Sequence, residues 1–324
     1  MSTIVTRVLT AVFLLGIVTY LLPERQENST AKPPLQNAKR PRSAVASFPK
    51  DLKILEDIPY REGDSKAWKL DLVMLREQGE TKRPALIFVN GNGWSSVNKS
   101  RGIFSSGPVE YARKGYVCLR VNYRQTDEAP FPASLEDVKC AVRWLRAHAD
   151  EYHVDPQRIG GYGYSTGAHL VSLLGLVDSE SDREGDGPWQ DQSSMLNAVC
   201  ASAIPTKFVN WSDGVEEKPI PCQLLETPDT CLQEQTAKAS PDSSVHTNAP
   251  PFLLFQSTRD RRIDASQADR FVEGLKAAGA EDVTYHRYEK TGHRVFSQHR
   301  AKNRALMEEF FDRTLLHPPG DEAP

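Results

Sequence analysis

Apolar runs separated by polar turns predict alternating strands and helices from about residue 50 onward. Two segments in which apolar and polar residues alternate, 53–60 and 69–75, predict a first pair of strands. Later runs are apolar throughout, a pattern typical of parallel strands that are covered on both faces. We expect strands of this kind or shorter ones at 84–89, 115–123, 158–162, 198–204, 252–256 and 283–288.

A helix is predicted between two of these strands, over residues 134–149. Its apolar residues fall on one face, and Ser134 with Asp137 predicts a capping box at its start. The alternation of strand and helix along the chain predicts an α/β fold with a mostly parallel, doubly wound sheet. In such sheets ligands bind at the carboxyl ends of the strands.

The first fifty or so residues have a different character. Arg7 precedes the mostly apolar run 8–22, so residues 1–23 predict a signal sequence or signal anchor, with an ordinary amphipathic or buried helix as the alternative. The Pro-rich stretch 24–49 predicts a disordered linker, followed by a folded domain over 50–317 and a disordered tail over 318–324. We therefore expect an exported protein, anchored in the membrane on the periplasmic or extracellular side or secreted after cleavage.

Length, composition and charge indicate which broad class of protein the chain belongs to. The chain has 324 residues, a net charge of -3 and 26% charged residues, which fits a soluble globular protein and does not indicate nucleic-acid binding. Its length allows one large α/β domain with a tail or two smaller domains. The acidic stretch 178–191 lacks EF-hand spacing, so a solvated loop is favoured over a calcium site. The stretch 207–241 is predicted to be an insertion over the strand ends, where specificity loops commonly lie.

The five cysteines lack the spacing of a metal site. Cys118 and Cys140 fall in apolar patterns and are expected to be buried thiols. Cys222 and Cys231 flank a loop and could close a small disulfide ring in an oxidising compartment, and the sequence leaves open whether they pair.

The sequence Gly163-Tyr164-Ser165-Thr166-Gly167 has the form GxSxG and stands between a predicted strand and a predicted helix. This is the context of a nucleophile elbow, in which a sharp turn lifts the serine hydroxyl clear of the sheet. Ser165 is therefore the candidate nucleophile. The alternative is an ordinary glycine-rich turn.

Four sequence blocks between about residues 70 and 296 resemble those of α/β-hydrolases of the hormone-sensitive-lipase and carboxylesterase group, in particular bacterial feruloyl- and acetyl-esterase-like (BD-FAE-type) enzymes. NGNGW stands where these enzymes have HGGGW, and VNYRQTDEAPFPA resembles VNYRLAPEAPFPA. RIGGYGYSTGAHL resembles RIGxxGxSAGGHLA, and the last block comprises STRDRRID followed by EKTGHRVF. The resemblance implies the α/β-hydrolase fold with small insertion loops.

A serine nucleophile needs a base and an orienting acid, which in this fold follow the serine in the order acid, then histidine. Asp260 lies in the loop after the predicted strand 252–256, and His293 lies after the predicted strand 283–288. We assign Asp260 as the acid, because the matched block favours it over Asp264, and His293 as the base. Less favoured candidates are Asp242, His169, His286 and His299.

The resemblance also assigns an oxyanion hole to the backbone N–H groups of Asn92, Gly93 and Thr166. In this chain Asn90 replaces the histidine of the HGGGW block and Asn92 replaces a glycine. Asparagine tolerates left-handed backbone conformations, so the loop can keep its shape, and Asn90 can still form a local hydrogen bond.

These residues predict a serine carboxylesterase that cleaves short-acyl or aryl esters and needs no metal or cofactor. The asparagine substitutions keep a second hypothesis open, a catalytically impaired hydrolase that acts as a binding protein. A third is a prolyl-oligopeptidase-like peptidase, although such enzymes carry a large additional domain for which the residues before position 50 are too few. The expected partner is a small ester, and the sequence does not indicate an oligomeric state.

Overall fold

The structure is a computed structural model that describes residues 49–77, 79–91, 93–95, 103–178, 181–208, 224 and 233–318. The predicted signal segment 1–23, nearly all of the linker 24–49 and most of the tail lie outside these residues, as do Cys222 and Cys231. Their predicted roles therefore stay predictions. No helix among the described residues combines the length and the apolar character that a bilayer crossing requires.

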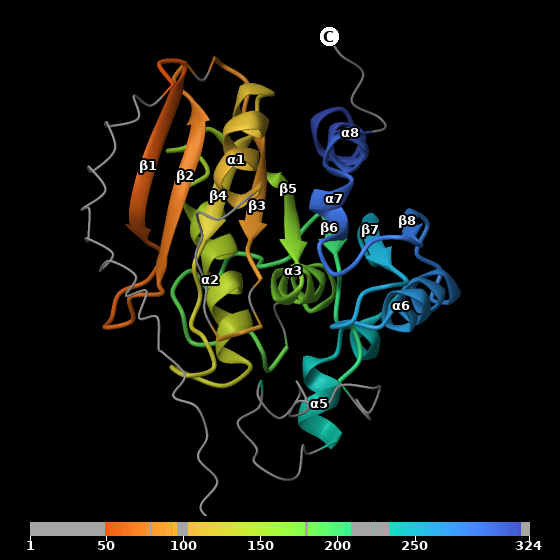
Figure 1. Cartoon of the computed structure of the whole chain (residues 1–324). Coiled ribbons are helices and arrows are strands. Elements are labelled where there is room, and N and C mark those ends of the chain that lie inside the picture. The colour runs from red at the N-terminus through yellow and green to blue at the C-terminus, as the bar shows by residue number, and fades with distance from the viewer. Residues whose placement is uncertain are drawn as a thin grey trace, which may run out of the picture. The chain divides into compact units, whose positions relative to one another are not determined.

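The strands form one eight-stranded sheet in the order β1-β2-β4-β3-β5-β6-β7-β8 (Figure 1). β2 is antiparallel to its neighbours β1 and β4, and every other neighbouring pair is parallel. The predicted, mostly parallel sheet is therefore confirmed. The strands are β1 Leu52–Pro59, β2 Lys69–Leu75, β3 Arg83–Val89, β4 Val117–Val121, β5 Val154–Tyr164, β6 Ala198–Ser202, β7 Phe252–Ser257 and β8 Val283–Tyr288.

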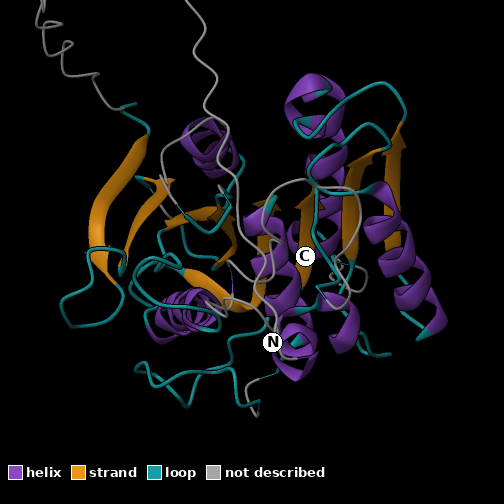
Figure 2. Cartoon of the chain, turned by 60° about the horizontal axis from the view of Figure 1, so that its bottom comes forward, coloured by secondary structure: helices purple, strands orange, loops and turns teal. Residues whose placement is uncertain are grey.

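Helices cover both faces of the sheet (Figure 2). One face packs against α2, α3 and α6, and the other against α1, α7 and α8. The helical segments are α1 Ile103–Arg113, α2 Ala133–Ala147, α3 Thr166–Leu176, α5 Gln233–Ala239, the short 3-10 turn Pro241–Ser244, α6 Ala265–Ala277, α7 Val295–Gln298, α8 Arg300–Phe311 and the π turn Asp312–Leu316.

The central strands are apolar throughout because each face has its own core. In β3, Ile87 and Val89 belong to the core under α2 and α3, whereas Leu86 and Phe88 belong to the core under α1 and α8. Successive side chains of a strand point to opposite faces, so a strand buried on both sides needs apolar residues at every position. Cys118 and Cys140, together with Cys200, are buried free thiols as expected.

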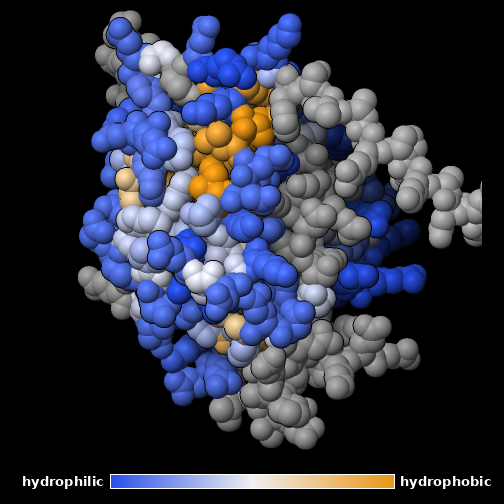
Figure 3. Space-filling model, turned by 90° about the vertical axis from the view of Figure 1, so that its left-hand side faces the viewer, coloured by the Kyte–Doolittle hydropathy of each residue, from blue (hydrophilic) through white to orange (hydrophobic). Residues whose placement is uncertain are grey.

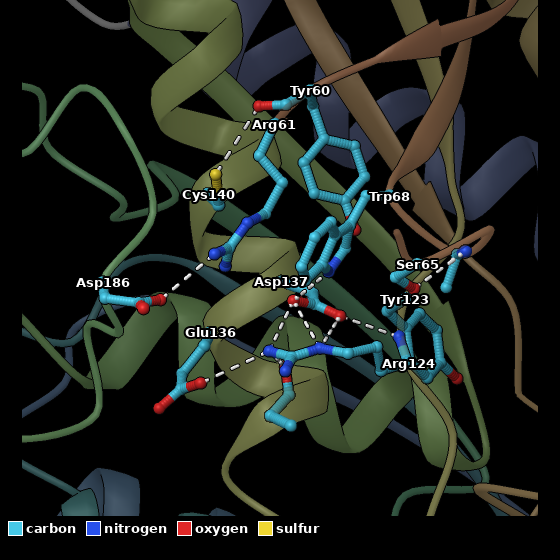
Figure 4. A network of polar contacts seen from close by, with 12 residues as sticks. Tyr60, Arg61, Ser65, Trp68, Tyr123, Arg124, Glu136, Asp137, Cys140 and Asp186 are labelled. Atoms are coloured by element: carbon cyan, nitrogen blue, oxygen red, sulfur yellow. Dashed lines mark hydrogen bonds and ion pairs between the residues drawn. The ribbon is translucent and has the colours of Figure 1, made fainter. Parts of the chain in front are cut away.

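The start of α2 differs from the prediction. The residue before its first turn is Pro132, and no side chain caps the helix, so the predicted Ser134 and Asp137 capping box is wrong. Asp137 instead accepts hydrogen bonds from the Arg124 side chain, at 2.8 to 3.1 Å, and from Trp68 Nε1 at 2.9 Å (Figure 4). The carboxylate is fully buried, and a cationic partner compensates for its lost hydration better than backbone N–H groups alone.

β1 closes the sheet as an edge strand, and Figure 3 shows the side of the molecule on which it lies. Most of the coloured surface there is hydrophilic, and one patch of hydrophobic residues lies in the upper part of the view. Lys53, Glu56 and Asp57 of β1 are exposed. Charged residues along an exposed edge oppose pairing with the strand of another molecule.

The acidic loop after α3 is held by two buried cations of α2. Lys139 Nζ donates to Glu184 Oε2 at 2.5 Å and to the Val177 carbonyl at 2.9 Å, and Arg143 pairs with the other oxygen of Glu184. Glu184 is buried, so this part of the loop is not the solvated segment that its composition predicted. Among the described residues, no group of three or more potential metal-ligating side chains occurs.

Replacement of Lys139 by methionine is expected to destabilise the domain. It leaves Glu184 buried with one cation in place of two, and breaking a buried ion pair costs about 3 kcal/mol. Urea unfolding followed by circular dichroism measures this loss. The matched control is Lys82→Met, because Lys82 pairs with Asp150 at the exposed surface. Equal unfolding midpoints for the two variants would contradict a structural role for the buried pair.

Candidate active site

Ser165 occupies a strained turn between β5 and α3. Its backbone has φ 54° and ψ -120°, a combination that side-chain-bearing residues rarely adopt. The Ser165 N–H donates to the Ser202 carbonyl of β6 at 2.8 Å, which fixes the turn against the neighbouring strand. The hydroxyl consequently lies at the carboxyl end of the parallel strands, at the N-terminus of α3, as the nucleophile-elbow prediction requires.

Three glycines allow the backbone to pack this tightly. A Cβ on Gly163 would lie 2.2 Å from the Gly167 carbonyl oxygen, and a Cβ on Gly167 would lie 1.9 Å from the Val89 carbonyl oxygen. A Cβ on Gly91 would lie 2.0 Å from the Tyr164 carbonyl oxygen. The end of β3, the end of β5 and the start of α3 therefore meet through backbone atoms, and any side chain at these positions would separate them.

The structure brings the three predicted triad residues together. His293 Nε2 lies 3.1 Å from Ser165 Oγ, and His293 Nδ1 lies 2.8 Å from Asp260 Oδ2. Asp260 follows β7 and His293 follows β8, so both come from loops at the same edge of the sheet as the elbow. The His293 side chain is 16% exposed and that of Asp260 is fully buried, which leaves the histidine accessible while its acid is shielded from water.

Asp260 is buried but fully hydrogen-bonded. Its Oδ1 accepts the backbone N–H groups of Arg262 at 2.9 Å and Ile263 at 3.1 Å, and Gln256 Nε2 lies 3.4 Å from Oδ2. These donors compensate for the loss of water around the carboxylate. They also fix its orientation, so that Oδ2 faces His293.

The less favoured candidates lie elsewhere. Asp264 caps α6 by accepting the Ser266 N–H at 2.8 Å. His286 lies in β8 and stacks on Phe255, and His299 stacks on Tyr288. Asp242 belongs to the 3-10 turn after α5, and burial raises the pKa of its carboxyl group.

His169 lies in α3 behind the elbow and is completely buried. Its Nε2 lies 2.7 Å from the Ala239 carbonyl, and its ring contacts Trp94 and Phe208. Burial lowers the pKa of His169 to about 4, so the ring is neutral at physiological pH. A neutral ring held by this bond and by aromatic contacts supports the loop after β3 rather than acting as a base.

The predicted oxyanion loop is only partly described, because Asn92 lies outside the described residues. Asn90 Oδ1 accepts the Gly91 N–H at 2.9 Å, the local hydrogen bond expected of this substitution. Gly93 has φ 68°, and its N–H donates to the Thr166 hydroxyl at 2.9 Å. The sequence assigned only the Thr166 backbone to this site, so the role of its fully buried side chain as an acceptor was missed.

The sequence of this chain is similar to those of known esterases. A family model described as BD-FAE matches residues 70–275. Esterase LipC of Mycobacterium tuberculosis is 31% identical over 240 residues, which cover 71% of this chain and 58% of LipC. The probable carboxylic ester hydrolase LipM of the same organism is 28% identical over 233 residues, which cover 70% of this chain and 53% of LipM. The chain thus spans somewhat more than half the length of these relatives.

Solved structures with the same fold are also esterases. A truncated form of a carbohydrate esterase from gut microbiota aligns with a TM-score of 0.73 and 23% identity, over 82% of this chain and 96% of that one. Thermogutta terrifontis esterase 2 phosphonylated by cyclosarin aligns with a TM-score of 0.66 and 25% identity, over 83% of this chain and 96% of that one. These alignments establish the α/β-hydrolase fold.

Two substitutions of Ser165 are expected to separate backbone strain from chemistry. A side-chain-bearing residue in this backbone conformation carries about 1 to 3 kcal/mol of strain. Ser165→Gly removes the Cβ and relieves this strain, but it also raises the entropy of the unfolded chain, which offsets part of the gain. We expect it to unfold with a free energy about 1 kcal/mol higher than Ser165→Ala, which keeps the Cβ. Urea titration of both variants measures the difference, and equal stabilities would show that the turn is not strained.

Proposed function

The chain belongs to the BD-FAE family, and on that basis we propose that it is a serine hydrolase that cleaves carboxylic esters through an acyl-enzyme on Ser165. One observation carries the proposal: hydrogen bonds at 3.1 and 2.8 Å link Ser165, His293 and Asp260 in a line at the carboxyl edge of the sheet. A serine hydroxyl becomes an effective nucleophile only when a base takes its proton as it attacks.

In the proposed reaction, Ser165 Oγ attacks the ester carbonyl while His293 Nε2 takes the hydroxyl proton. Asp260 holds the ring by accepting the Nδ1 hydrogen and stabilises the imidazolium that forms. His293 then gives the proton to the leaving alcohol, and a water molecule repeats the sequence to release the acid. Every proton transfer uses groups that this chain supplies, so the proposed cycle requires no metal or cofactor.

The developing oxyanion lies, in this proposal, next to the first turn of α3. The N–H groups of a helix N-terminus and its dipole favour negative charge at this place. The Thr166 N–H is one proposed donor, and the N–H of the loop residue Asn92 is the other. The Gly93 N–H, which the family resemblance also assigned as a donor, is bonded to the Thr166 hydroxyl instead. We propose that this bond fixes the loop that carries Asn92.

Short-acyl or aryl esters are the proposed substrates, as the resemblance to bacterial carboxylesterases implies. The full-length chain is expected to hydrolyse p-nitrophenyl acetate faster than p-nitrophenyl octanoate. Ser165→Ala should lose this activity by a factor of at least about 1000, because the nucleophile is gone while the fold remains. Release of p-nitrophenolate measures the rates, and circular dichroism verifies the folding of the variant. Equal rates for the parent and the variant would rule out catalysis by Ser165.

Thr166→Val tests the proposed support of the oxyanion loop. Valine has nearly the shape of threonine but cannot accept the Gly93 N–H, and one hydrogen bond is worth about 1 kcal/mol. We therefore expect kcat for p-nitrophenyl acetate to fall about 5- to 10-fold with little change in KM. Thr166→Ser keeps the hydroxyl and should retain most of the activity. If valine and serine have the same effect, the hydroxyl does not support the loop.

A further inference from the structure

The two loops that carry Asp260 and His293 also carry a group of exposed cations. We call this group the basic rim, and it consists of Arg259, Arg261, Arg262, Lys290 and Arg294. Two exposed carboxylates flank these cations, Asp264 and Glu289, and the charge of Asp260 is buried against His293. The rim therefore has an excess of positive charge beside the proposed catalytic groups, although the whole chain has a net charge of -3.

Hydrogen bonds hold the two loops together. The Thr258 N–H donates to the Tyr288 carbonyl at 2.8 Å, and the Thr258 hydroxyl donates to the Glu289 carbonyl at 3.1 Å. Ser257 Oγ donates to the carbonyl of Thr291. The backbone segments that carry these cations are consequently held next to each other.

Among the described residues, none of the five rim cations forms an ion pair, whereas two other arginines around β8 do. Arg287 pairs with Asp269 at 3.1 Å, and Arg313 pairs with Asp282. An uncompensated cluster of guanidinium groups attracts anions, and a guanidinium can bind a carboxylate through two parallel hydrogen bonds.

The backbones of two rim residues adjoin residues of the proposed triad. The Arg262 backbone N–H donates to Asp260 Oδ1 at 2.9 Å, and Arg294 directly follows His293. The ring of Tyr164, next to Ser165, lies 5.2 Å from that of His293. Burial and the Asp260 charge raise the pKa of Tyr164 to about 12, while the charges of Arg294 and Arg262 act to lower it. Both guanidinium charges thus act on a side chain adjacent to the nucleophile.

We infer that the preferred substrate is an ester that carries a carboxylate near the scissile bond, and that Arg262 and Arg294 bind this carboxylate. The inference rests on the proposed function and adds the chemical class of the substrate. A neutral ester would leave the rim cations solvated and would gain nothing from them. A carboxylate on either the acid or the alcohol part would be attracted to the site and oriented in it.

The test compares charged and neutral esters of the same shape with the full-length chain. For the alcohol side the pair is 4-acetoxybenzoate and 4-acetoxybenzamide, and for the acid side it is monomethyl terephthalate and methyl 4-carbamoylbenzoate. The quantity measured is the ratio of kcat/KM for the charged ester to that for its neutral partner. This ratio cancels any general effect of a substitution on the catalytic groups.

We expect Arg262→Gln and Arg294→Gln each to lower this ratio about 2- to 5-fold in at least one pair, the range for exposed charge pairs. The double variant should lower it about 10-fold, and 0.5 M salt should reduce the ratio of the parent. Lys53→Gln removes the same charge from β1, at the opposite edge of the sheet, and should leave the ratio unchanged.

The possible failures are distinguishable. If the parent hydrolyses the neutral esters but neither rim variant changes the ratio in either pair, the rim is an ordinary solvated surface and the substrate inference is wrong. If the folded parent hydrolyses neither p-nitrophenyl acetate nor any of the four esters, the proposed esterase function is wrong. The inferred preference for a carboxylate-bearing ester is then wrong as well.

Discussion

The close contact of three backbone segments around Ser165 is the constraint on which the site depends. β3, β5 and α3 meet there at distances that leave no room for a Cβ on Gly91, Gly163 or Gly167. The contact holds Ser165 at φ 54° and raises its hydroxyl above the sheet. A strained residue persists only where its surroundings fix it, and here the surroundings are the backbone of the sheet itself.

The rest of the fold positions His293 and Asp260 next to the Ser165 hydroxyl. Because neighbouring parallel strands end at one edge, the loops after β7 and β8 bring an acid and a histidine to the serine from positions more than ninety residues later in the chain. An apolar core on each face packs the sheet against its helices. Buried Asp260, with its own set of donors, then fixes the orientation of His293.

Much of this arrangement could be predicted from local sequence. The apolar runs identified the strands, and the GxSxG turn between strand and helix identified Ser165, because both signals are confined to a few neighbouring residues. The choice of Asp260 over Asp264 needed the family resemblance, since both follow the same strand. The structure places only Asp260 against His293, while Asp264 caps α6.

The features that were missed depend on partners distant in the sequence. Asp137 has the spacing of a helix cap, but Arg124 and Trp68 bind its carboxylate, and local spacing does not reveal this competition. Glu184 belongs to an acidic run that resembles solvated surface, yet it lies buried because Lys139 comes from a helix 45 residues away. The Thr166 hydroxyl likewise has its partner, Gly93, 73 residues earlier in the chain.

Covalent labelling of the full-length chain with a fluorophosphonate, followed by peptide mass spectrometry, tests directly whether His293 activates Ser165. Such a reagent reacts with a serine only when a base activates its hydroxyl. We expect a single adduct on Ser165 that is absent from His293→Ala and from the urea-unfolded chain. A folded chain that takes up no label, or that is labelled elsewhere while Ser165 stays free, would contradict activation of Ser165 by His293.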